Sequence, residues 1–418
     1  MQGPALTLVR VGLLVYYLYM TPRISIITAI GSALLLAGCG SDEAQPQVSA
    51  PAPAATTPTQ TPFQPAIPRL ADGPHLGMIT GFDPLDATRE AEARARYAAA
   101  QSAGATIGRI QIDWSELETG PGVYDQEALD NAFVDFALDG MNVIVLVSTL
   151  DSDGLTVPSY LGESDGLSDG RTFASPEVIE AFNGLLDWLR PQLEARSVWG
   201  LSIGNEVDSP INDGIVTPDD ATTFYEATLS HWNDTSPDIG VAVTLTIGAI
   251  DTLPAFQARI REASDFVIFN YYCLDAALTV TGPAQWEADL AAMKQAAGER
   301  EIFIQELGCP VGYSPQALPT SIGGSLENQI AFFDYFADVF ANDPQMRAAT
   351  MFQLFDWSPE LARSFSDPVR DAGEGLAADR LEEWLATSGF VRWTDLAERP
   401  AWNSWLAALE KARAAREQ

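Results

Sequence analysis

The stretch IGRIQIDWSELETGPGVYDQEALDNAFVDFALDGMNVIVLV, residues 107–147, decides the fold. It holds two β-rich apolar runs, at 106–113 and 142–149, on either side of a segment from Gln126 to Asp139 whose apolar residues recur three or four positions apart. An apolar run, a helical segment and a second apolar run are typical of two parallel strands joined by a crossover helix. The stretch therefore predicts one β-α-β unit.

The same alternation extends over the chain from His75 onward. Eight apolar runs are expected to be strands, at 75–81, 106–113, 142–149, 199–204, 241–247, 266–272, 301–306 and 348–355. Further helical segments include Arg89 to Ser102, Pro176 to Ala195, Ala221 to Trp232 and Leu326 to Phe340. Eight repeats predict a (β/α)₈ TIM barrel, a single α/β domain with loop insertions, because about 345 residues exceed the ~250 of a plain barrel. The alternative, a doubly wound open sheet, would need fewer strands and usually a G-x-G-x-x-G turn, which follows none of the runs.

The residues before the barrel have a different composition. Arg23 precedes an apolar run from Ile24 to Ala37, and the run ends in Leu-Ala-Gly-Cys at Cys39. Segment 1–39 resembles a bacterial lipoprotein signal, and the resemblance implies that Cys39 carries a lipid anchor in the bacterial cell envelope, facing the periplasm or the cell surface. The alternative, a transmembrane helix, would need ~20 apolar residues, more than this run has. Segment 40–70 is rich in Pro, Ala and Thr and predicts a disordered linker, which leaves 71–418 for the barrel.

The charge of the chain limits its partners. A formal net charge of −34 at pH 7 makes nucleic acid or anionic lipid an unfavourable partner, because phosphates would be repelled. A neutral polymer remains compatible with this charge, although acidity also has an ordinary interpretation as solubility or adaptation to salt. We expect no nucleic-acid partner and a monomer.

Two glutamates follow strands of the predicted barrel. Glu206 ends the fourth run in VWGLSIGNEVD, residues 198–208, and Glu306 ends the seventh in EIFIQELGCP, residues 301–310. A buried carboxylate needs a partner, a metal or a catalytic task, because an unpaired charge is costly to bury. Carboxyl ends of barrel strands form the active-site face, so the two side chains are expected to meet across the barrel mouth.

Paired carboxylates either bind metals or cleave glycosides as acid and nucleophile. With only His75 and His231 in the chain, a histidine-rich metal centre is poorly supplied, whereas a magnesium site of carboxylates alone and two structural glutamates stay open. We therefore predict glycoside hydrolysis with no metal and no cofactor. A mechanism that retains the configuration of the sugar would need the two carboxyl groups about 5–5.5 Å apart. The pKa of the acid would have to be raised, while the nucleophile would have to be ionised.

This arrangement, an Asn-Glu pair after the fourth strand and a second Glu after the seventh, resembles the clan A retaining glycoside hydrolases over the whole domain. The resemblance implies that Glu206 is the acid/base, that Glu306 attacks the anomeric carbon, and that Asn205 binds the sugar 2-hydroxyl. Stretch 107–147 is similar to the strand-two region of retaining β-glucosidases, which implies that Arg109 donates to Glu306. An ordinary salt bridge is the alternative for this arginine.

Other residues of the site are also implied by the resemblance. SDFVIFNYYCLD, residues 264–275, resembles the Asn-Tyr-Tyr pattern of the same enzymes, so Tyr272 would bond Glu306 unless it is a core aromatic. Asn270, where the family often has His, is expected to contact substrate. Trp357, in MFQLFDWSPE, stands where the clan has the tryptophan under the cleaved sugar. Trp114 is expected either to form another cleft wall or to pack in the core.

The two remaining cysteines are expected to pair. Cys273 lies three residues past Asn270 and Cys309 three past Glu306, which puts both at one level above adjacent strands. Neighbouring strands are close enough for the usual Cα separation of a disulfide, and an exported protein permits the bond.

The predicted function is hydrolysis of a β-linked neutral oligo- or polysaccharide by double displacement. The alternatives are a surface lipoprotein that only binds glycans, or a transglycosylase with the same residues. The glycan, its linkage and endo or exo action stay open.

Overall fold

The computed structural model describes residues 72–417 except 135–137, 139, 153, 197, 237 and 314–320. The predicted signal segment, Cys39 and the linker lie outside the described residues. Among the helices of the described part, none is long and apolar enough to cross a membrane.

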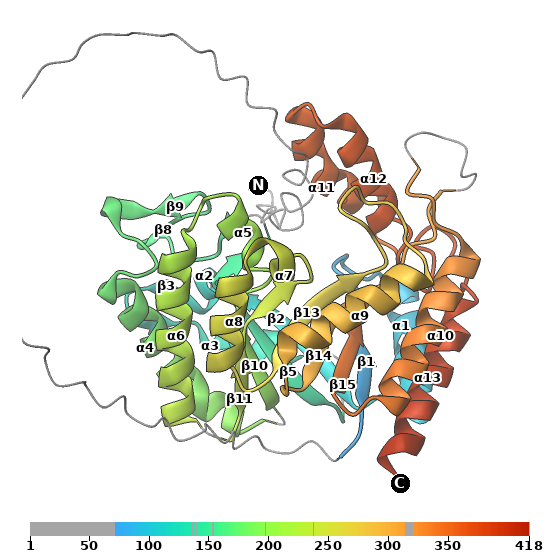
Figure 1. Ribbon diagram of the computed structural model, residues 1–418, viewed down its shortest axis with the longest axis horizontal. Helices are drawn as coiled ribbons and strands as arrows, with labels where there is room; N and C mark the ends of the chain where they lie inside the picture. Colours follow the sequence, from blue (N-terminus) through green and yellow to red (C-terminus); the bar gives the residue numbers. More distant parts are fainter. Residues whose placement is uncertain are drawn as a thin grey trace, which may run out of the picture. The chain divides into compact units, whose positions relative to one another are not determined.

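The strands form one parallel barrel (Figure 1). Its members in chain order are β1 (His75–Met78), β2 (Ile107–Asp113), β5 (Asn142–Ser148), β10 (Val198–Ile203), β11 (Gly240–Ala242), β12 (Thr244–Thr246), β13 (Val267–Tyr272), β14 (Ile302–Gly308) and β15 (Met346–Met351). The strands pair in the order β11-β10-β5-β2-β1-β15-β14-β13-β12, all in parallel. β11 and β12 are the two halves of the predicted fifth strand, interrupted at Val243. One half pairs with β10 and the other with β13, which brings the two ends of the sheet together and confirms the (β/α)₈ fold.

Helices surround this barrel. The principal ones are α1 (Ala87–Ala103), α4 (Pro176–Glu194), α6 (Pro218–Thr235), α8 (Pro254–Ala263), α9 (Pro283–Ala297), α10 (Leu326–Asn342) and α13 (Ala401–Arg416). Their starts follow from sequence: Asp86 accepts from the backbone N–H groups of Thr88 and Arg89 at α1, and a proline opens α4, α6, α8 and α9. α3 (Gln126–Ala132) is shorter than the predicted helix to Asp139, and residues 135–137 and 139 are outside the described part.

The insertions follow the carboxyl ends of strands. They include α2 (Trp114–Leu117) with the hairpin β3 (Glu118–Gly120) and β4 (Val123–Tyr124), the hairpins β6 (Leu150–Asp151) with β7 (Gly154–Leu155) and β8 (Gly162–Glu163) with β9 (Gly166–Leu167), the helices α5 (Asp208–Asn212) and α7 (Ala249–Thr252), and the helical pair α11 (Pro359–Asp371) and α12 (Gly375–Leu385). Figure 1 shows β8–β9, α5 and α11–α12 at the same end of the barrel. These segments build the rim around the strand ends.

Apolar side chains fill one part of the barrel interior. This cluster consists of Ile107, Ile144, Trp199, Ala242, Phe266, Ile268, Phe303 and Ala348, all nearly inaccessible to solvent. Trp199 stacks on Phe266 with ring centroids 5.0 Å apart. Most of these residues stand early in their strands, so the carboxyl ends of the strands are left for polar side chains.

Candidate active site

Polar side chains from four strands meet at the carboxyl end of the barrel. They are Arg109 from β2, Asn205 and Glu206 just past β10, Asn270 and Tyr272 from β13, and Gln305 and Glu306 from β14, each at most 7% exposed. The structure therefore brings together six residues predicted from the sequence, and adds Gln305.

The turn after β10 fixes the position of Glu206. Gly204 has φ +83°, and a Cβ there would come within 2.5 Å of Val207 and 2.8 Å of the Tyr225 hydroxyl, so only glycine fits. Glu206 itself has φ +46°, which is unusual for a residue with a side chain. Such a strained conformation persists only where its surroundings enforce it, and it often occurs at functional sites.

Glu306 accepts two strong hydrogen bonds. Arg109 Nη1 lies 2.8 Å from Glu306 Oε1, and the Tyr272 hydroxyl donates to Oε2. Burial raises the pKa of Glu306, while the Arg109 charge and the Tyr272 hydrogen bond oppose that rise. The predicted contacts of Arg109 and Tyr272 with Glu306 are both present.

Glu206 has no cationic partner among the described residues. Its Oε2 accepts from Ser152 Oγ at 2.7 Å and its Oε1 accepts from Asn270 Nδ2 at 2.9 Å. Burial raises the pKa of Glu206 to about 8, and the neighbouring charge of Glu306 adds to the rise. The carboxyl is thus protonated at neutral pH, which is the state that a general acid needs.

A network behind Glu206 holds Asn205. Asn205 Nδ2 donates to Asp151 Oδ1 at 3.0 Å, while Asn205 Oδ1 accepts from Asn270 Nδ2 and Gln305 Nε2, both at 3.3 Å. Asp151 Oδ2 accepts from Gln111 Nε2 at 2.8 Å, and Gln111 in turn accepts from Arg109. The amide of Asn205 is therefore fixed in one orientation.

Sequence reasoning missed Asp151 and Ser152. Both come soon after the third apolar run, just past Leu150, so the rule that selected Glu206 and Glu306 applies to them as well. Asp151 and Ser152 stand in a polar, acidic stretch, so neither differs from its neighbours in the way that Glu206 and Glu306 differ from the apolar runs before them.

Asn270 links the two glutamates. In the register of β13 and β14 it lies beside Glu306, while its side chain reaches Glu206. Its Oδ1 is buried and has no hydrogen-bond partner among the described residues. A buried, unpaired acceptor at such a place can bind a donor group of a ligand.

Trp357 lies beside the cluster and is only 2% exposed. Phe82, 40% exposed, packs edge-on against it with ring centroids 5.4 Å apart, and Phe352 lies between Trp357 and Tyr272. Trp357 also borders a cavity of about 550 Å³ whose walls include Tyr313 and Trp393. Phe82, which the sequence did not single out, is more exposed than Trp357.

Trp114 is not part of a cleft wall, which corrects one of its two predicted roles. Its side chain is fully buried, with the indole 4.9 Å from the ring of Phe182 and Nε1 donating to Glu118 Oε2 at 2.8 Å. The chain turns into α2 directly after β2, and this turn carries the indole toward α4 and α6 rather than toward the barrel axis. The alternative interpretation, a core indole, is the correct one.

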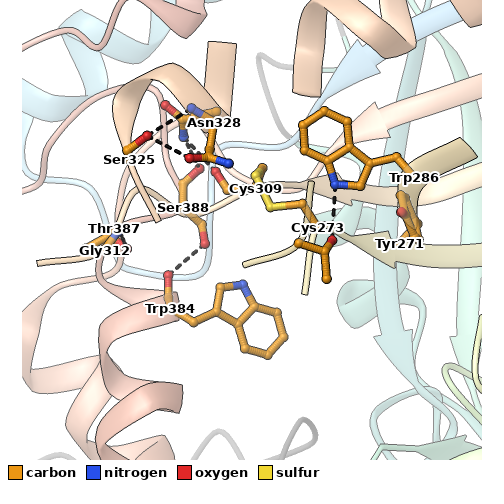
Figure 2. The surroundings of a disulfide bond; sticks show 12 residues. Tyr271, Cys273, Trp286, Cys309, Gly312, Ser325, Asn328, Trp384, Thr387 and Ser388 are labelled. Atoms are coloured by element: carbon orange, nitrogen blue, oxygen red, sulfur yellow. Dashed lines mark hydrogen bonds between the residues drawn. A yellow bond between two sulfur atoms is a disulfide. The ribbon is translucent and has the colours of Figure 1, made fainter. Parts of the chain in front are cut away.

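A disulfide joins the ends of the sixth and seventh barrel strands, as predicted (Figure 2). Cys273 and Cys309 have Cα atoms 5.1 Å apart, and they follow Tyr272 and Gly308 directly. Gln329 Nε2 donates to the Cys309 carbonyl at 2.9 Å and so ties the bond to α10. The covalent link holds the two strand ends that position Tyr272 and Glu306.

The site has the side chains for acid–base chemistry. In the described residues there is no group of three or more His, Cys, Asp or Glu side chains arranged to hold a metal ion. The arrangement instead consists of one carboxyl with a raised pKa and a second carboxyl that an arginine and a tyrosine contact.

Comparison with known proteins supports the fold. No protein-family model and no curated protein matches the sequence. GH5_18 from Streptomyces cattleya, solved in complex with GlcNAc, is 20% identical over 82% of this chain and 81% of its own, with a TM-score of 0.60. GH5_18 from Bifidobacterium longum subsp. infantis is 16% identical over 82% and 80%, with a TM-score of 0.58. The exo-β-1,4-mannosidase Op5Man5 from Opitutaceae bacterium strain TAV5 is 14% identical over 85% and 63%, with a TM-score of 0.58. This chain shares the (β/α)₈ barrel of these proteins.

Proposed function

We propose that the protein is a retaining glycoside hydrolase that cleaves a β-linked neutral saccharide. The observation that carries the proposal is the contrast between two neighbouring buried carboxyls. Arg109 and Tyr272 favour the ionised form of Glu306, whereas Glu206 has no cationic partner in the described part and a pKa raised to about 8. A nucleophile and an acid need these two opposite charge states.

In the first step, Glu306 attacks the anomeric carbon and the glycosidic bond breaks. Glu206 gives its proton to the departing oxygen, so the leaving group departs as an alcohol. The product is a sugar esterified to Glu306, with Glu206 ionised. Arg109 then no longer faces a full negative charge, because Glu306 is now a neutral ester and the negative charge is on Glu206.

In the second step, a water molecule attacks the anomeric carbon of this ester. Glu206 takes the proton from the water and returns to its acid form, while Glu306 leaves as a carboxylate that Arg109 and Tyr272 again stabilise. Two inversions give net retention. A transglycosylase would use the same residues with a sugar hydroxyl in place of water.

The site offers groups for the sugar itself. The unpaired Asn270 Oδ1 can accept from a sugar hydroxyl, and the fixed amide of Asn205 can donate to the 2-hydroxyl. Phe82, which packs on the buried Trp357, supplies aromatic surface for the C–H face of a pyranose. One structural neighbour was solved with Manβ1-4GlcNAc and another is an exo-β-1,4-mannosidase, so β-1,4-linked mannosides are the first substrates to test.

The test is a panel of aryl β-glycosides and β-1,4-mannosyl disaccharides with wild type, Glu206→Ala and Glu306→Ala. We expect azide to restore turnover of an activated substrate by Glu206→Ala and to yield a β-azide, and Glu306→Ala to be inactive. Asp265→Asn is the control, since this buried acid lies at the opposite end of the barrel beside Val241. Full activity of Glu306→Ala would contradict the mechanism. Saccharide binding without turnover by wild type would support a glycan-binding protein instead.

We also propose that Cys39 carries a lipid that holds the enzyme at the bacterial envelope as a monomer, with 40–70 as its tether. The support is the Leu-Ala-Gly-Cys sequence after an apolar run. Labelling of cells with an alkynyl fatty acid should mark the wild-type protein and not Cys39→Ser, which should appear in the soluble fraction. Labelling that persists in Cys39→Ser would overturn this part of the proposal, and light scattering of the barrel domain tests the monomer.

A further inference from the structure

Ser152 contacts two carboxyl groups with a single hydroxyl. Its Oγ lies 2.7 Å from Glu206 Oε2 and 3.2 Å from Asp151 Oδ1, and the side chain is fully buried. A serine hydroxyl has one hydrogen to donate and lone pairs to accept with, so it can donate to only one of these oxygens at a time. Which oxygen receives the hydrogen depends on the charge of the two carboxyls.

Asp151 is held as a hydrogen-bond acceptor. Besides Ser152 Oγ, it accepts from Ser152 N at 2.7 Å, Asn205 Nδ2 at 3.0 Å, Gln111 Nε2 at 2.8 Å and Ser148 Oγ at 3.3 Å. Burial raises the pKa of Asp151, and these donors oppose that rise because they favour the ionised carboxylate. Asp151 can therefore receive a hydrogen bond from Ser152 throughout a reaction at Glu206.

In the acid form of Glu206 we place the proton on Oε2, the oxygen that in the structure accepts from Ser152 Oγ. Oε1 accepts from Asn270 Nδ2, which marks it as the carbonyl oxygen. Protonated Oε2 then donates to Ser152 Oγ, and the serine hydrogen is directed to Asp151. When Oε2 has lost its proton, the same hydroxyl can donate to it.

We propose that Ser152 is a positioning residue for Glu206, with a hydroxyl that donates to Asp151 while Glu206 is protonated and turns to donate to Glu206 once that carboxyl is ionised. The inference rests on the proposed function, in which Glu206 alternates between these two forms. No proton is gained or lost by Ser152. Glu206 gives its proton to the leaving oxygen in the first step and recovers one from water in the second.

The backbone keeps the two carboxyls and the serine in register. Asn205 N donates to the Leu150 carbonyl and Gly204 N to the Val147 carbonyl, both at 2.8 Å, so the turn carrying Glu206 is joined to the segment carrying Ser152. The other charged or titratable groups that act on Glu206 are Glu306 on β14 and Asp208 on α5, with Arg109 and Tyr272 bound to Glu306. None of these four donates to Glu206, which leaves Ser152 and Asn270 as its donors among the described residues.

The experiment compares wild type, Ser152→Ala, Ser152→Thr and Ser264→Ala. Ser264 is the matched control, a buried serine just before β13 at the opposite end of the barrel, and its Oγ has no partner among the described residues. The substrates are two glycosides of one sugar. Dinitrophenol leaves without a proton, whereas a sugar alcohol needs one from Glu206.

For Ser152→Ala we expect kcat/KM to fall about 10- to 100-fold on the disaccharide and by less than about threefold on the dinitrophenyl glycoside. The alkaline limb of the pH profile should rise by about one pH unit, because the ionised Glu206 loses a charge-assisted donor. Ser152→Thr should restore both properties, and Ser264→Ala should match wild type. Equal losses on both substrates, or an unmoved alkaline limb, would show a merely structural role and overturn the inference.

A readout that needs no turnover separates this inference from the proposed function. Infrared titration of the carboxyl band, with Glu206→Gln used to identify the band, gives the pKa of Glu206 in wild type and in Ser152→Ala. A higher pKa in the folded alanine variant supports the role of Ser152, and an unchanged pKa contradicts it. Inactivity of wild type on every glycoside would refute the proposed function and with it the role of Ser152 in positioning Glu206 for catalysis, whatever the titration shows.

Discussion

Arg109 Nη1 lies 2.8 Å from Glu306 Oε1, and the two side chains are only 2% and 3% exposed. The pair is buried at the mouth of a barrel whose other polar groups are mostly neutral or acidic. Removal of one partner of such a pair leaves a buried charge without compensation. Loss of Arg109 should therefore change the charge state of Glu306.

We expect Arg109→Met to lower kcat/KM about 10²- to 10³-fold and to move the acid limb of the pH profile upward. The sign follows because loss of the positive charge raises the pKa of Glu306, so the nucleophile becomes protonated at a higher pH. Activity against pH measures this shift. Arg399→Met is the matched control, because it breaks another buried pair, with Asp356 at 2.6 and 2.8 Å, away from the two glutamates. The control should lose about 3–5 kcal/mol of stability without a shift of the acid limb. An acid limb that stays in place in Arg109→Met would refute the role of this arginine.

The sequence predicted those parts of the site that the strand pattern itself determines. Arg109, Asn270 and Tyr272 stand within strands, so their facing follows from the period of two and the direction of the barrel. Glu306 departs from that period, because the pairing of β13 with β14 skips Gln305, and Gln305 and Glu306 both reach the site. Tyr271 is the neighbour of Tyr272 in β13, so the alternation of side chains along a strand points it outward. Its hydroxyl accordingly reaches Asp289 on α9.

The parts that the sequence did not predict lie where the chain leaves a strand. Trp114 comes directly after β2, and only the turn into α2 decides that the indole packs on Phe182 instead of facing the cleft. Ser152 reaches Glu206 because the β6–β7 hairpin folds back after β5, a loop geometry that residue type alone does not specify. The break at Val243 in the fifth strand likewise has no local signal in an otherwise regular apolar run.

Phe82 and Trp114 should respond differently to replacement by alanine. Phe82 is 40% exposed and packs on Trp357, so Phe82→Ala should raise KM about three- to tenfold and change stability by less than about 1 kcal/mol. Trp114 is wholly buried, so Trp114→Ala should cost about 3–5 kcal/mol of stability with KM unchanged in the folded fraction. Urea unfolding and steady-state kinetics check both. A raised KM in a fully folded Trp114→Ala protein would contradict the core position of Trp114 and would favour its other predicted role, a wall of the cleft.

The disulfide should stabilise the barrel measurably. Cys273 and Cys309 are 36 residues apart, and closing a loop of that length in the unfolded chain stabilises the folded state by about 3–4 kcal/mol in the chain-entropy account. We expect the Cys273→Ser, Cys309→Ser double variant to unfold at lower urea concentration, and reducing agent to lower the midpoint of wild type only. Because the bond follows Tyr272 directly, kcat/KM should also fall at temperatures well below unfolding. Two free thiols in the oxidised wild-type protein would contradict the bond.

Glu206 should make the protein less stable as pH rises. Its pKa is about 8 in the folded state, against an ordinary value of 4.5, so between these two values the unfolded chain ionises while the folded one keeps its proton. The unfolded state then binds fewer protons than the native state, and the free energy of unfolding decreases as pH rises through this window. Glu206→Gln removes the titration while keeping a neutral group of similar shape. We therefore expect this variant to be more stable than wild type by about 3 kcal/mol at pH 7 and equally stable near pH 4.

Glu287→Gln, at an exposed position of α9, should follow wild type at both pH values. Urea unfolding at pH 4 and pH 7 measures the difference. An equal stability of wild type and Glu206→Gln at pH 7 would mean that Glu206 is not held protonated, and the acid of the proposed mechanism would have to be sought elsewhere.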